Sequence, residues 1–116
     1  MNPSPQQWLA NRASLPGMLA CGVRRPDGGQ VSHSREDICP TGKVEQLLNQ
    51  FENLRSALFA GPAAPRWWTW TFEQGQIRFV ARPDGWVLGL VARHDSDAIP
   101  QLDPLSNEFL SLEFGR

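Results

Sequence analysis

The chain has no excess of charge of either sign, since its 116 residues include 11 lysines and arginines and 12 aspartates and glutamates. The net charge of −1 provides no basic field for nucleic acid or for a membrane surface. The longest apolar run, Trp86 to Ala92, is much shorter than a membrane span. The first residues lack the charged start and apolar run of a secretory signal. We therefore expect a cytoplasmic protein that binds no nucleic acid and does not insert into membranes.

Residue types that carry chemistry are scarce. The two cysteines, Cys21 and Cys39, are too few for a disulfide framework, and we expect both to be reduced, buried thiols. The two histidines are His33 and His94. His94 and Asp97 could contribute metal ligands, but no second histidine or cysteine lies near them in the sequence. We expect no catalytic residues, no metal site and no cofactor, and therefore no enzyme.

Turn signals and hydrophobic periodicity predict the element order α-β-β-α-β-β-β-α. Ser4 and Gln7 form a capping box that starts the first helix, and Asp103 is expected to cap the last. The expected ranges are a helix from about 5 to 13, strands at 18–23 and 30–34, a long helix at 41–60 with Thr41 as N-cap, strands at 66–72, 76–82 and 86–92, and a helix from 104.

These elements predict a single α+β domain over residues 1–116. The hairpins favour a five-stranded antiparallel sheet, with 86–92 as its central strand and 66–72 at an edge. The long helix should cover one face and the two terminal helices the other. Within the long helix, apolar side chains recur at helical spacing, including Leu47, Leu48 and Phe51.

The edge strand at 66–72 is the strongest candidate for an interface. No lysine or aspartate guards it against pairing with another chain. Alternation puts Trp68, Trp70 and Phe72 on one face, and we expect both of these tryptophans to be core beneath the long helix. The other face carries the candidate interface residues Trp67, Thr69 and Thr71, of which Trp67 is the best hot-spot candidate.

The outer face of the long helix is polar but nearly uncharged. It carries Gln46, Asn49, Gln50 and Asn53. This composition fits either a second part of the interface or an ordinary solvated face.

Several features together resemble the roadblock/dynein light-chain family of longin-like domains. They are Leu15-Pro16-Gly17 before a small-residue strand, the Asp27-Gly28 turn, the helix at 41–60, the Glu73-Gln74-Gly75 turn, the strand at 76–82, the Asp84-Gly85 turn before Trp86 to Ala92, and a closing helix. The resemblance implies a dimer in which the long helix packs against its copy and the third strand pairs with its copy. It also implies non-catalytic work, as a platform for small Ras-like GTPases or as an assembly subunit.

Two functions therefore compete. The first is a homodimeric protein-binding module that regulates or scaffolds a small GTPase. The alternative is a small-molecule sensor of profilin- or PAS-like type, with a cavity between the long helix and the sheet lined by Phe51, Trp68, Trp70 and Phe79. The partner, the pathway and the choice between homodimer and heterodimer do not follow from the sequence.

Overall fold

The computed structural model describes residues 4–34, 45–51, 53, 67–73, 75–94 and 96–114. Its elements are α1 (Pro5–Ala13), β1 (Met18–Arg24), β2 (Gln30–Ser34), β3 (Trp67–Phe72), β4 (Gly75–Ala81), β5 (Val87–Arg93), a 3-10 turn (Ile99–Gln101) and α3 (Leu102–Ser111). Residues 45–51 and 53 are also helical, as expected for the long helix. The remainder of the expected range 41–60, including the Thr41 cap, lies outside the described residues, as does Cys39.

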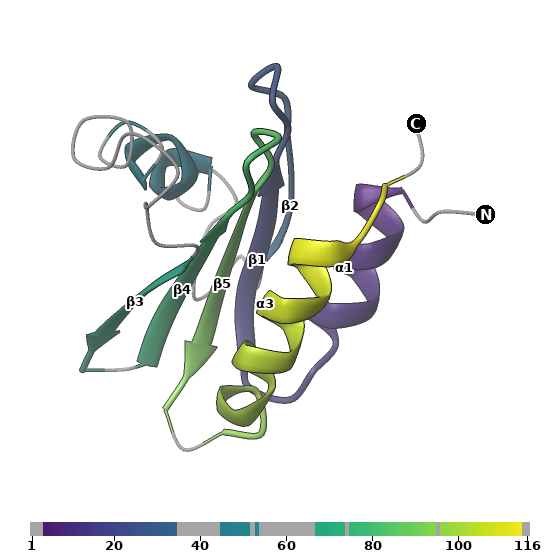
Figure 1. The fold of residues 1–116 in the computed structure, drawn as a ribbon. Coiled ribbons are helices and arrows are strands. Elements are labelled where there is room, and N and C mark those ends of the chain that lie inside the picture. The colour runs from purple at the N-terminus through teal and green to yellow at the C-terminus, as the bar shows by residue number, and fades with distance from the viewer. Residues whose placement is uncertain are drawn as a thin grey trace.

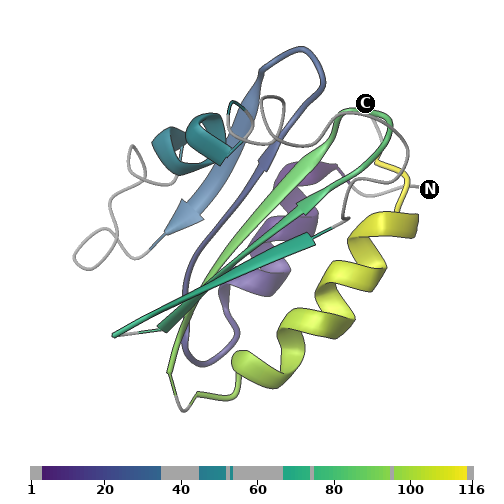
Figure 2. The same ribbon diagram turned by 60° about the vertical axis from the view of Figure 1, so that its left-hand side comes forward.

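One antiparallel sheet organises the fold, with the strand order β2-β1-β5-β4-β3. Its arrangement can be followed in Figures 1 and 2. Helices α1 and α3 lie together on one face, and the helical segment 45–51 lies on the opposite face. The α+β class, the antiparallel sheet, the central position of β5 and the edge position of β3 are therefore confirmed.

The sheet separates two apolar layers, because alternate side chains of each strand point to opposite faces. Leu88 and Leu90 of β5 join the layer beneath α1 and α3, and Val87 and Val91 join the layer beneath segment 45–51. Gly89 lies directly under the helical segment, since a Cβ there would come within 2.9 Å of Leu48 Cδ2. Glycine at this position lets the helix approach the centre of the sheet.

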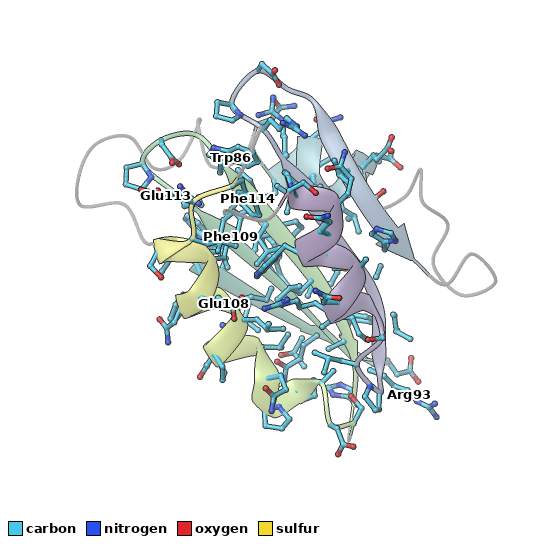
Figure 3. All side chains as sticks on the ribbon, turned by 90° about the vertical axis from the view of Figure 1, so that its right-hand side faces the viewer. Trp86, Arg93, Glu108, Phe109, Glu113 and Phe114 are labelled. Carbon is cyan, nitrogen blue, oxygen red and sulfur yellow. The ribbon has the colours of Figure 1, made fainter. Side chains whose placement is uncertain are left out.

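The two terminal helices are joined to each other as well as to the sheet. The Ser4 hydroxyl accepts from the Gln7 backbone N–H at 3.2 Å, which confirms the capping box of α1. Glu108 of α3 accepts from Trp8 Nε1 at 2.5 Å and pairs with Arg12. Near the end of α3, the Phe114 ring centroid lies 4.8 Å from that of Trp86, and both are labelled in Figure 3.

The expected cap of the last helix is wrong. The chain is already helical from Ile99, and α3 begins at Leu102 with Gln101 as its N-cap. Pro100 fits this preceding turn because proline needs no N–H partner there. Asp103 consequently lies in the first turn of α3, where its carboxylate pairs with Arg78 at 2.9 Å.

The thiol of Cys21 lies in the core layer beneath α1 and is 0% exposed. Burial raises its pKa to about 12, since the thiolate would lose its hydration. In a Cys39→Ser variant we expect iodoacetamide at pH 8 to leave Cys21 unmodified, and to alkylate it rapidly in denaturant. The adduct is measured by intact mass. Alkylation at equal rates in the native and unfolded states would contradict this burial.

Candidate functional site

Strand β3 forms one edge of the sheet and pairs with β4 in a regular antiparallel register. Among the described residues, no strand lies on its outer side. Thr69, Trp70, Thr71 and Phe72 are all exposed. Within the part of the chain that the structure describes, β3 therefore presents a strand edge with no strand beside it and two exposed aromatic side chains.

The face of β3 that carries Trp68, Trp70 and Phe72 points toward the helical segment 45–51, as the alternation predicted. The Phe51 ring centroid lies 4.9 Å from that of Trp68 and 6.1 Å from that of Trp70. Trp70 and Phe72 are nevertheless 41% and 36% exposed. The expectation that Trp70 belongs to the core is therefore wrong. Among the described residues its ring packs against Phe51 and Phe79, and β3 is the last strand of the sheet, so no further strand covers it there.

The opposite face of β3 carries Trp67, Thr69 and Thr71. Trp67 is half-buried and packs against the layer beneath α1 and α3. The Arg78 guanidinium lies 5.2 Å from the Trp67 ring centroid, and Arg78 Nε donates to Thr69 Oγ1 at 2.6 Å. Trp67 is therefore better covered by its own chain than Trp70 or Phe72, which are exposed. Thr71 is exposed.

Arg78 is a buried charge that connects β3 to α3. It is 8% exposed, and its Nη1 donates to Ser106 Oγ at 3.1 Å and pairs with Asp103 Oδ1 at 2.9 Å. Burying a guanidinium is costly unless its N–H groups have partners, and these contacts provide partners for Nε and Nη1. The network holds the α3-facing side of the edge strand in place.

The four candidate residues of the helical segment do not all lie beside the same strand. Gln46, Asn49, Gln50 and Asn53 are all exposed, as expected. Asn49 Oδ1 accepts from Gln30 Nε2 of β2 at 2.8 Å, so Asn49 lies toward the other edge of the sheet. Gln50 lies toward β3, where it lines an apolar hollow. The structure thus brings Gln50, and not Asn49, to the aromatic edge.

This hollow, the apolar groove, is lined by Leu47, Gln50, Phe51, Trp70, Ile77 and Phe79 and has a volume of about 270 Å³. It lies between the helical segment and β3–β4, where the sensor hypothesis places its cavity. The sensor alternative named Trp70 as a lining residue, but the predicted interface left out Trp70, Phe72 and Ile77, because alternation assigned them to the covered face. The predicted edge position of β3 could have indicated that the face with Trp70 and Phe72 is covered only in part.

The second hollow lies at the C-terminal end of β5 and is polar. It is lined by Pro16, Gly17, Arg93, His94, Ser96 and Asp97 and measures about 410 Å³. His94 Nε2 lies 2.7 Å from the Phe72 carbonyl oxygen, so the imidazole anchors the β3–β4 hairpin. Within the described residues, no group of three or more His, Cys, Asp or Glu side chains could hold a metal ion.

The described helices include none with the length and apolar character needed to cross a bilayer. No model of a known protein family matches this chain, and no curated protein matches it significantly.

Proposed function

We propose that this chain is a non-catalytic, homodimerising protein-binding module of roadblock type. It acts in the cytoplasm as a regulator or scaffold of a small Ras-like GTPase or of another protein. The observation that carries the proposal is the uncharged edge strand β3, with Trp70 and Phe72 exposed beside the apolar groove. Natural edge strands are usually protected by charge, proline or a bulge, and β3 has none of these between Trp67 and Phe72.

The shape of the groove supports a protein ligand over an enclosed small molecule. Its volume of about 270 Å³ is below the roughly 300–1,000 Å³ of typical ligand pockets. Its walls include Trp70 and Gln50, which are both exposed, so the groove opens at the surface. Such a groove suits one or two apolar side chains of a partner.

The chemistry of the described residues also supports a non-catalytic role. The Cys21 thiol, with a pKa of about 12, provides no thiolate at neutral pH. The imidazole of His94 is engaged with the Phe72 carbonyl. Cys21 and His94 therefore do not provide a nucleophile paired with a base.

A single lysine on the edge tests the proposal. We expect Thr71→Lys to raise the dimer dissociation constant at least tenfold, about 1.4 kcal/mol, because it places a charge on the pairing edge. Sedimentation equilibrium at micromolar concentrations measures the change. Gln6→Lys is the matched control, since it adds the same charge at an exposed site of α1 and should leave the dimer unchanged.

The oligomeric state of the wild-type chain and its response to small ligands distinguish the two functions. A strict monomer at these concentrations would overturn the homodimer. A monomer whose Tm rises with a small apolar ligand would favour the sensor instead. The choice of a GTPase as partner rests on the family resemblance, and affinity capture from the native cell with the dimeric protein tests it. A capture that contains other proteins and no GTPase would contradict that part of the proposal.

A further inference from the structure

Three polar side-chain atoms on β1 and β2 are buried and have no hydrogen-bond partner among the described residues. They are Arg24 Nε, Gln30 Oε1 and Ser32 Oγ. Nearly all buried polar groups in folded proteins have a partner, because burial removes the water that binds them in the unfolded chain. Since these atoms gather on two paired strands, they indicate a bound group that is not one of the described side chains.

The three side chains lie on the same face of the sheet. Arg24 and Gln30 are directly opposite each other in the β1–β2 register, and Ser32 follows two residues after Gln30. Ala20, four residues before Arg24 on β1, belongs to the layer beneath the helical segment 45–51. Gln30 Nε2 also donates to this segment, which lies beside β2 in Figure 2. The three atoms therefore lie on the helical-segment side of the sheet, toward the edge opposite to β3.

A glycine lies next to the Ser32 side chain on this face. Gly22 of β1 is directly opposite Ser32, and Gly89 of β5 is directly opposite Gly22. Leu48 of the helical segment lies over Gly89. Gly22 is buried, so its position lies inside the protein. Because glycine has no side chain, it leaves more room beside the Ser32 hydroxyl than any other residue would.

The hydrogen-bonding chemistry of the three atoms identifies the ligand. Arg24 Nε–H only donates, Gln30 Oε1 only accepts, and the Ser32 hydroxyl can do either. A water molecule donates twice and accepts twice, so one water provides a partner for all three, which is the usual number for a buried water. The Arg24 guanidinium disfavours a metal cation. The Gln30 carbonyl oxygen disfavours an anion, because the N–H side of that amide already donates to Asn49.

The spacing of the two strands fits such a bridge. Directly opposite residues have Cβ atoms about 4.5–5.5 Å apart. A water bonded at about 2.7–3.2 Å to each partner joins groups roughly 5 Å apart. Arg24 and Gln30 have long side chains, which can extend to the position beside Ser32.

We propose that an internal water molecule bridges Arg24 Nε, Gln30 Oε1 and Ser32 Oγ. The water joins β1 and β2, and Gln30 extends the connection to Asn49 of the helical segment. Hydrogen bonds then hold the helical segment near β2, whereas aromatic rings hold it near β3. The site lies inside one chain, so it forms whether or not the protein dimerises.

A high-resolution crystal structure of the wild-type chain tests the site directly. We expect a single water peak within about 2.7–3.2 Å of all three atoms. A protein group bonded to these atoms in its place would overturn the proposal. So would a chloride ion, which bromide replaces and anomalous scattering identifies.

A pair of variants tests the same site in solution. Valine and threonine have nearly the same shape, and only threonine keeps the hydroxyl. We therefore expect Ser32→Val to lose one long-lived internal water per chain and Ser32→Thr to keep it. Magnetic relaxation dispersion of water oxygen-17 measures the number of such waters. Equal numbers in the two variants would contradict a water bound to the Ser32 hydroxyl.

Discussion

Phe79→Ala is expected to lower the free energy of unfolding by about 3–5 kcal/mol, the usual cost of removing a buried phenylalanine ring. Phe79 is 3% exposed, and its ring stacks on Phe51 with centroids 4.4 Å apart and an interplanar angle of 4°. Its ring centroid also lies 5.2 Å from that of Trp70, in a T-shaped arrangement. The deletion removes the floor of the apolar groove, and the rings above it cannot fill the space without moving. Urea unfolding followed by tryptophan fluorescence measures the loss.

Phe72→Ala is the matched control for this prediction. It deletes the same side chain from the adjacent strand and the same face, but Phe72 is 36% exposed. We expect a loss below about 1 kcal/mol at concentrations where the chain is monomeric. The dimer should weaken in parallel, because Phe72 contributes to the edge. Equal losses of stability in the two variants would contradict the arrangement of β3 over the groove.

Arg78→Ala is expected to cost about 1.5–3 kcal/mol, the range for hydrogen bonds that involve a charged group. The substitution removes the donors to Thr69 and Ser106 and the guanidinium over Trp67. The ion pair with Asp103 adds little to this cost, since the Asp103 side chain is 72% exposed. Thermal and chemical unfolding measure the effect.

Two further variants give this second prediction its control. Arg78→Met keeps most of the apolar stem and removes the buried charge, so we expect it to recover most of the loss. Arg93→Ala removes an exposed arginine from the neighbouring strand and should change stability by less than about 0.5 kcal/mol. If Arg78→Ala were as mild as Arg93→Ala, the network between β3 and α3 would not stabilise the fold.

The local structure of this protein could be predicted where the signal is short-range. The capping box of Ser4 and Gln7 starts α1 because both partners lie within one turn. The Pro-Asp-Gly turns close their hairpins, with Gly28 and Gly85 at φ of +94° and +97°, a conformation that favours glycine. The apolar strand at 86–92 indicated coverage on both faces, and β5 is the central strand with helices on both sides of the sheet.

The candidate site could be predicted only in outline. Alternation correctly divided β3 into two faces, since a pleated strand has a period of two. It could not indicate how far each face is covered, which depends on the elements that pack there. The periodicity of the long helix identified Gln50 and Asn49 equally, and only the packing of the helix placed Gln50 beside β3 and Asn49 beside Gln30.

By itself, the sequence determined the α+β class, the order of the elements and the uncharged character of the edge strand. These depend on near neighbours in the chain and on periodicity. Only the tertiary structure decided that Trp70 is exposed, that Arg78 is buried and partnered, and that Asp103 pairs with Arg78 instead of capping α3. These outcomes depend on contacts between residues distant in sequence, because burial and pairing are set by what packs against a side chain.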